Sequence, residues 1–115
     1  QYYNDIDGSI SRKLASALAF HQVCCSAALR RMRFLEYRHG GGSLAPHIDL
    51  ARTDSITGLK STHTFILYLS SCDIGGETAI FSNDKAATTL AIVKPLRGRL
   101  LLFPHRALHA GLETV

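Results

Sequence analysis

A histidine and an aspartate two positions apart, His47 and Asp49, form the pair in this chain best suited to chemistry. On a β-strand, residues i and i+2 point to the same face, so this imidazole and this carboxylate can meet one ion from one side. A metal ion would need a further ligand from elsewhere in the chain. The pair by itself is weak evidence, because two polar side chains on a surface strand often occur by chance.

The candidate third ligand lies in the segment Pro104-His105-Arg106-Ala107-Leu108-His109, which offers two histidines. Two histidines and one carboxylate on one face of an octahedron leave positions open for substrate and oxygen, and this ligand set is typical of non-haem Fe(II) oxygenases. The motif contains no thiolate that would favour zinc. The pattern therefore indicates an iron site, with His105 and His109 competing for the third position.

The elements that would position these residues are one helix followed by short strands. Between Ser11 and about Ala28, apolar residues recur every third or fourth position, which predicts an amphipathic helix packed on a sheet. Asp5, Asp7 and Gly8 precede it and indicate a turn and a helix cap. Extended patterns then predict only strands, over residues 32–38, 44–47, 62–69, 77–81, 88–93, 98–104 and 106–112.

Short strands separated by turn signals favour a sandwich or a barrel. The glycines at positions 40–42 are expected to reverse the chain by adopting positive φ, and so to aim the strand that carries His47. The length of 115 residues predicts a single domain with one core. We expect this domain to span residues 1–115, with the helix at about 11–28.

Composition excludes several classes of protein. Hydrophobic residues make up 46% and charged residues 19%, a globular balance without signs of disorder. The net charge is +4, but the basic residues are scattered except for Arg30, Arg31 and Arg33, and a nucleic-acid partner is therefore not expected. No apolar run is long enough for a membrane span and no signal peptide is visible, so the compartment stays open.

Three cysteines occur, of which Cys24 and Cys25 are adjacent and Cys72 stands alone. An odd count without regular spacing argues against a disulfide framework and against a zinc knuckle, so buried free thiols are expected. The chain begins with Gln1 rather than Met, and it ends at Val115 within an apolar-patterned stretch. We therefore expect it to be a fragment of a longer domain.

Several motifs share the order and spacing of a known family: Tyr37-Arg38-His39-Gly40-Gly41-Gly42-Ser43-Leu44-Ala45-Pro46-His47-Ile48-Asp49, Phe65-Ile66-Leu67-Tyr68-Leu69-Ser70, Gly75-Gly76-Glu77-Thr78, Leu100-Leu101-Leu102-Phe103-Pro104-His105 and His109-Ala110-Gly111. From Phe34 to Val115 the chain resembles the Fe(II)/2-oxoglutarate-dependent dioxygenases, specifically the prolyl 4-hydroxylase-like branch. The resemblance implies a mainly β fold, with a double-stranded β-helix (jelly-roll) core over about 32–115, a flanking N-terminal helix and a missing C-terminal strand.

The resemblance also implies an activity and a metal site. Fe(II) would be held by His47, Asp49 and His109, and His109 is preferred over His105 because His-Ala-Gly after the preceding strand matches the family. The enzyme would hydroxylate a prolyl or related residue of a peptide or protein, coupled to the decarboxylation of 2-oxoglutarate to succinate and CO₂. Fe(II), 2-oxoglutarate and O₂ are the implied cofactor and co-substrates, and ascorbate is a further candidate.

Four residues are candidates for binding 2-oxoglutarate. Tyr37 lies ten residues before the first metal histidine, where the family has a tyrosine that lines the co-substrate pocket. Tyr68 matches a family tyrosine that bonds the distal carboxylate. Thr64 shares the strand parity of Tyr68 and should face the same cavity, and Thr78 is a candidate wall residue.

One expected residue is absent. The family places a Lys or Arg nine or ten residues beyond the distal histidine, whereas this chain ends six residues after His109. A buried dianion without a cation is costly. We expect the cation to lie beyond Val115 and this 115-residue form to have reduced stability and little activity. Substitution by Arg97, Arg99 or Arg106, or weak binding of 2-oxoglutarate, are the alternatives.

Two other functions compete with the hydroxylase. One is a non-catalytic or degenerate jelly-roll binding module, which the missing cation favours. The other is a nucleic-acid demethylase of the same superfamily, whose arginine-rich ending this sequence lacks. Substrate identity and oligomeric state are not encoded in any pattern that we can interpret.

Overall fold

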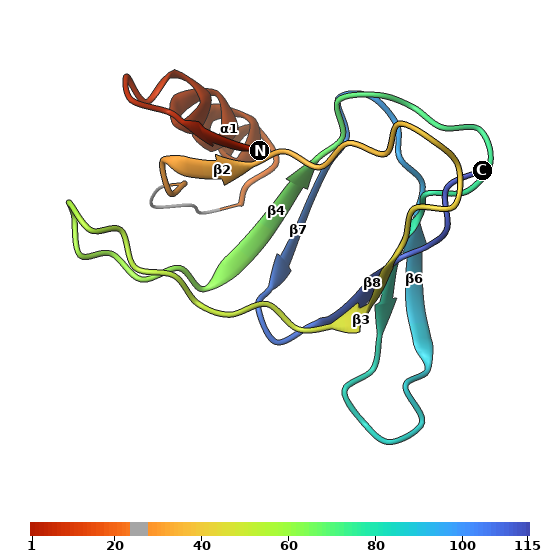
Figure 1. The fold of residues 1–115 in the computed structure, drawn as a ribbon. Coiled ribbons are helices and arrows are strands. Elements are labelled where there is room, and N and C mark those ends of the chain that lie inside the picture. The colour runs from red at the N-terminus through yellow and green to blue at the C-terminus, as the bar shows by residue number, and fades with distance from the viewer. Residues whose placement is uncertain (24–27) are drawn as a thin grey trace. The chain divides into compact units, whose positions relative to one another are not determined.

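The computed structural model describes residues 1–23 and 28–115, and in these ranges the protein is mainly β with one helix, as predicted. Cys24 and Cys25 lie outside the described residues. The elements, shown in Figure 1, are β1 (Tyr2–Asn4), α1 (Ser9–Phe20), β2 (Arg31–Arg33), β3 (Leu44–His47), β4 (His63–Leu67), β5 (Thr78–Phe81), β6 (Thr89–Val93), β7 (Leu100–Pro104) and β8 (Leu108–Gly111).

The chain forms two compact units. The first unit comprises Gln1–Glu36 and Thr53–Leu59, and it contains α1 and the antiparallel pair of β1 and β2. The second unit comprises Tyr37–Arg52 and Lys60–Val115, and it contains all the remaining strands. The sequence did not predict β1, because residues 1–11 carry turn signals.

The N-terminus of α1 is capped by a buried carboxylate. Gly8 stands at the N-cap and has no side chain to offer. Asp5, which is 0% exposed, accepts hydrogen bonds from the backbone N–H groups of Ile10 and Ser11 at 3.1 and 2.9 Å. Its negative charge also suits the positive end of the helix dipole. The predicted cap is therefore present, and Asp5 provides it.

The C-terminal end predicted for this helix is wrong. The helix ends at Phe20 rather than near Ala28, and among its residues Leu14 alone is buried. Gln22 adopts a left-handed conformation with φ of 60°, and the N–H groups of Gln22 and Val23 bond back to the carbonyls of Ala19 and Leu18 at 3.0 and 2.8 Å. This pair of bonds is a Schellman motif, which terminates the helix although the apolar spacing continues.

The second unit consists of two antiparallel sheets. One has the strand order β3-β8-β5-β6, and the other pairs β4 with β7. The sheets meet through side chains: the ring of Phe103 on β7 lies 4.6 Å from the ring of His109 on β8, and both residues are buried. Ala79 and Ala110 are also buried, and they lie opposite each other in the pairing of β5 with β8. The predicted strands of this region are confirmed, each within a few residues of its expected bounds.

The turn before β5 depends on a glycine. Gly75 has a φ of +80° and forms an antiparallel bridge with Thr114. A Cβ atom at this position would lie 2.5 Å from the carbonyl oxygen of Glu113. Because L-residues rarely adopt this φ and backbone atoms cannot move aside cheaply, only glycine fits without strain.

Replacement of Gly75 by alanine is expected to lower the free energy of unfolding by about 3 kcal/mol, because a steric clash adds to the conformational strain. Gly98 provides a matched control, since its φ is +85° and a Cβ atom there would meet nothing within 4 Å. Gly98→Ala should lose only the conformational part, about 1 kcal/mol. Urea unfolding of both variants measures the difference, and equal losses would show that the packing against Glu113 is unimportant.

Candidate metal centre

The two histidines of the predicted site are brought together by strand register. His47 ends β3 and His109 lies on β8, and the two residues are directly opposite each other in the antiparallel pair. Opposed residues on adjacent strands share one face of the sheet. The imidazole ring centroids are 4.2 Å apart. Residues that are far apart in the sequence therefore present their rings to the same space.

Asp49 completes the cluster from the segment after β3. One carboxylate oxygen, Oδ1, lies 3.5 Å from Nε2 of His47, and the other, Oδ2, lies 3.6 Å from Nε2 of His109. Ligand atoms at about 2.1 Å from one ion lie about 3 Å apart at adjacent octahedral corners. The three side chains form a cluster that could hold a metal ion.

The backbone sets the histidine tautomers. Nδ1 of His47 lies 2.7 Å from the carbonyl oxygen of Ala45, and Nδ1 of His109 lies 2.9 Å from that of Ala107. A carbonyl oxygen can only accept a hydrogen bond, so Nδ1 carries the proton in both rings. Each Nε2 then has a free lone pair, as metal ligation requires. The histidines are thus held in the form that binds a metal.

The burial of the cluster is uneven. The side chain of His109 is 7% exposed, whereas that of His47 is 39% exposed and that of Asp49 is 26% exposed. Two of the three groups therefore reach solvent, and one side of the cluster is open. An open side is what a catalytic metal needs in order to admit further ligands, in contrast to a closed structural site.

The comparisons with known proteins bear directly on this arrangement. Residues 32–115 match the family model described as the 2OG-Fe(II) oxygenase superfamily. The chain belongs to this superfamily. Searches of the curated proteins and of the solved structures gave no match.

Membership of the 2OG-Fe(II) oxygenases identifies the chemistry that the cluster suits. The family implies Fe(II), 2-oxoglutarate and O₂, which are the cofactor and co-substrates expected from the sequence. The donor set of this oxygenase, two neutral imidazoles and one carboxylate, fits Fe(II).

No helix in the described parts of the chain is long and apolar enough to cross a membrane.

His105 takes a different position from His109 in this oxygenase. Its Nδ1 lies 2.9 Å from the hydroxyl of Thr64, and its Nε2 lies 2.7 Å from the hydroxyl of Ser61. Both ring nitrogens are therefore engaged by hydroxyl groups. Among the described residues, the cluster within ligating distance consists of His47, Asp49 and His109 and does not include His105.

The residues predicted to bind 2-oxoglutarate fall into separate surroundings. The phenol of Tyr68 lies 2.6 Å from the hydroxyl of Thr78. Burial raises the pKa of Tyr68 above its ordinary value of 10.0, so the phenol stays protonated at neutral pH and can donate a hydrogen bond. Thr64 donates to Oδ2 of Asp49, a member of the candidate metal cluster, at 2.7 Å.

The ring of Tyr37 accounts for one of the three glycines at positions 40–42, before β3. The ring lies against Gly42, where a Cβ atom would collide with the aromatic carbons. Within the run, Gly41 has the positive φ, at +93°. All three glycines were predicted to serve the backbone conformation, whereas Gly42 is required by the close approach of Tyr37. A tyrosine ten residues before His47 is thereby packed onto the turn that leads to the site.

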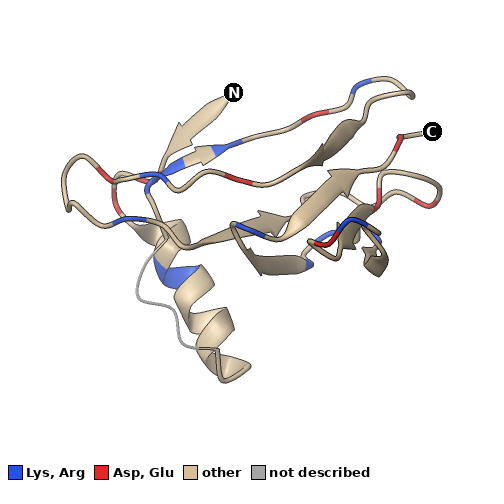
Figure 2. Cartoon of the chain, turned by 90° about the horizontal axis from the view of Figure 1, so that it is seen from below, with Lys and Arg blue, Asp and Glu red and all other residues tan. Residues whose placement is uncertain are grey.

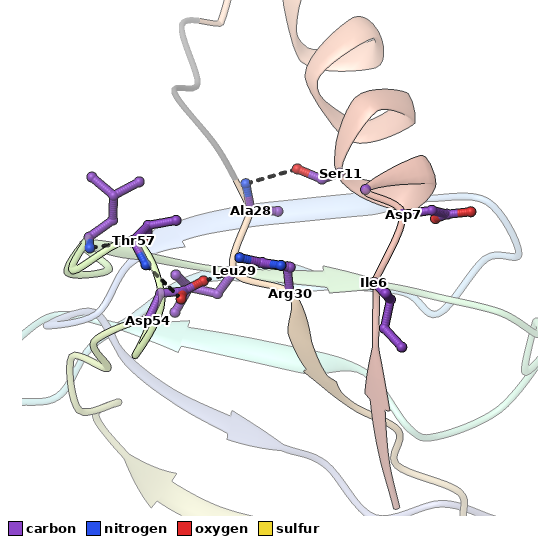
Figure 3. A pocket seen from close by; sticks show the side chains of 10 residues that line it. Ile6, Asp7, Ser11, Ala28, Leu29, Arg30, Asp54 and Thr57 are labelled. Carbon is purple, nitrogen blue, oxygen red and sulfur yellow. Dashed lines mark hydrogen bonds and ion pairs between the residues drawn. The ribbon is translucent and has the colours of Figure 1, made fainter.

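A pocket that the sequence did not indicate lies in the first unit. It has a volume of about 290 Å³ and is lined by apolar side chains such as Ile6 and Leu29, with Arg30 and Asp54 at its polar part (Figure 3). Nε of Arg30 lies 3.9 Å from Oδ2 of Asp54. Hydrogen bonds from backbone N–H groups lower the pKa of the Asp54 carboxyl, and the carboxylate therefore remains ionised opposite Arg30. None of the predicted site residues lines this pocket.

Proposed function

We propose that this oxygenase is a dioxygenase that hydroxylates a prolyl or related residue in a peptide or protein, and that its domain has a double-stranded β-helix core. The observation that carries the proposal is the cluster of His47, Asp49 and His109, with both Nε2 atoms turned toward the carboxylate inside the region matched by the family. Two antiparallel sheets that meet through Phe103 and His109 support the proposed core.

In the proposed mechanism, His47 and His109 would hold Fe(II) through Nε2, and Asp49 would hold it through a carboxylate oxygen. The bound iron would supply the activation of O₂ and the oxidative decarboxylation of 2-oxoglutarate. The chain supplies the orientation of the ligands. The carbonyls of Ala45 and Ala107 fix the two rings, and the ring of Phe103 packs 4.6 Å from that of His109.

We further propose that Tyr68 and Thr78 bind the distal carboxylate of 2-oxoglutarate. Thr64, which donates to Asp49, and Tyr37, which packs on Gly42, are proposed to contact other parts of the co-substrate. The protonated phenol supports this role, since only a donor suits a carboxylate. Arg99 is the favoured cation among the arginines considered. Its backbone carbonyl accepts the N–H of Tyr68 at 3.0 Å. Burial has the largest effect on the pKa of the Tyr68 phenol and raises it, whereas the hydrogen bond with Thr78 and then the positive charge of Arg99 lower it.

Tyr68→Phe is expected to raise the KM for 2-oxoglutarate about tenfold and to change kcat less, because it removes one hydrogen bond to a charged group in the bound state. Tyr2→Phe is a control in the first unit, where the tyrosine is half exposed and stacks with Arg31. Steady-state succinate formation at varied 2-oxoglutarate measures both constants. An unchanged KM would remove Tyr68 from the co-substrate site.

The experiment that tests the proposed function is succinate formation from 2-oxoglutarate, with Fe(II), O₂ and ascorbate present and with a proline-rich peptide added. We expect formation to require iron and to be stimulated by the peptide. Tight peptide binding without succinate would instead indicate a binding module. Stimulation by methylated oligonucleotides alone would indicate a demethylase, which the dispersal of Lys and Arg along the chain does not favour (Figure 2).

A further inference from the structure

A line of polar side chains extends from Asp49 through Thr64 and His105 to Ser61. The hydroxyl of Thr64 is 2.7 Å from Oδ2 of Asp49 and 2.9 Å from Nδ1 of His105. Nε2 of His105 is 2.7 Å from the hydroxyl of Ser61. That hydroxyl accepts the backbone N–H of Arg52 at 2.9 Å. Four consecutive hydrogen bonds thus connect the backbone to the carboxylate.

The direction of these bonds follows from what each group can donate. A carboxylate can only accept hydrogen bonds, so the hydroxyl of Thr64 donates its single proton to Oδ2. The Thr64 oxygen must then accept from His105, which places a proton on Nδ1. Nε2 of the neutral ring accepts the hydroxyl proton of Ser61. All donors point toward Asp49, and bonds aligned in this way polarise and strengthen one another.

The backbone ties the same residues together a second time. The N–H of Asp49 donates to the carbonyl oxygen of His105 at 3.0 Å, and the N–H of His105 donates to that of Thr62 at 3.1 Å. Thr64 lies opposite Phe103 in the pairing of β4 with β7, and Phe103 precedes His105 by two positions. Asp49 is therefore anchored to one rigid corner of the β4–β7 sheet through both its main chain and its side chain.

We propose that Thr64, His105 and Ser61 are positioning residues that fix the carboxylate of Asp49 for metal binding. The bond from Thr64 to Oδ2 holds the carboxylate in one orientation, with Oδ1 3.5 Å from Nε2 of His47 and Oδ2 3.6 Å from Nε2 of His109. The inference rests on the proposed function, and it assigns His105 a supporting role in place of ligation. Partners of this kind orient metal ligands, and their loss typically weakens metal affinity about 10–100-fold.

The test measures the dissociation constant of Mn(II), which resists oxidation in air, by electron paramagnetic resonance of the free ion. We expect Thr64→Val to weaken Mn(II) binding about tenfold or more. Thr64→Ser, which keeps the hydroxyl, should restore affinity close to that of the unmodified chain. His105→Asn should bind Mn(II) more tightly than His105→Leu, because an amide can replace the Nδ1–H donor. Thr89→Val, on an exposed position of β6, is the matched control and should change nothing.

Unfolding of the metal-free variants is measured in parallel. If Thr64→Val does not fold, the comparison of His105→Asn with His105→Leu tests the inference instead. Equal affinities for Thr64→Val and the unmodified chain, or for Asn and Leu at position 105, would overturn the inference while leaving the proposed function intact. Thr64→Ser binding as weakly as Thr64→Val would also overturn it. An unmodified chain that binds no Mn(II) and forms no succinate would overturn both proposals.

Discussion

Replacement of Asp49 by alanine is expected to abolish iron binding and to lower succinate formation by about a thousandfold or more. Asp49 is the anionic member of the cluster, and its two oxygens lie 3.5 and 3.6 Å from the Nε2 atoms of His47 and His109. Without it, two neutral imidazoles remain to hold a divalent cation. Because oxygen activation requires the metal, turnover should fall with iron content.

The measurement is iron content per chain after anaerobic loading and desalting, followed by succinate formation at saturating 2-oxoglutarate. Asp73→Ala is the matched control, since this exposed aspartate lies in the loop before Gly75 and outside the cluster. It should retain iron and activity. Full iron content in the Asp49→Ala variant would contradict the assignment of this carboxylate as a ligand.

Replacement of His109 by alanine is expected to remove iron and activity to the same extent as loss of Asp49, whereas His105→Ala should weaken iron binding but still load at saturating Fe(II). The effects of residues that act as one unit are not additive, so Asp49→Ala combined with His109→Ala should be no worse than either alone. The reason for the contrast is register, which sets His109 opposite His47.

His109 is also a core residue at 5% exposure, so its truncation leaves a cavity beside Phe103. His109→Gln keeps most of the volume and separates lost ligation from lost packing. Circular dichroism of the metal-free variants reports whether the fold is kept. Iron lost from the His105 variant alone, with His109→Gln still loaded, would reverse the assignment of the third ligand.

The pairing of His47 with Asp49 was predictable because its signal is local, whereas the choice of His109 as the third candidate ligand came from the resemblance to the dioxygenase family. The spacing of His47 and Asp49 places both on one side of an extended segment, and the strand carrying His109 follows a proline stop. The choice between His105 and His109 was not available from periodicity, since both follow the same strand. Pairing of β3 with β8 separates them, and pairing depends on the whole sheet.

Other features depend on contacts that a linear pattern does not contain. The end of α1 is set by the left-handed conformation of Gln22, a residue type that gives no stop signal. The need for glycine at position 42 arises from the ring of Tyr37. Thr64 was expected to face the co-substrate pocket from its strand parity, but its bond to Asp49 required the position of β4 relative to the metal segment.

The central claim is that His47, Asp49 and His109 hold one divalent metal and leave its remaining positions open for 2-oxoglutarate. A crystal structure of the chain grown anaerobically with Mn(II) and 2-oxoglutarate tests it most directly. We predict one ion bound by Nε2 of both histidines and an oxygen of Asp49, with the co-substrate on the same ion. An ion bound elsewhere, or bound by His105 in place of His109, would contradict this claim.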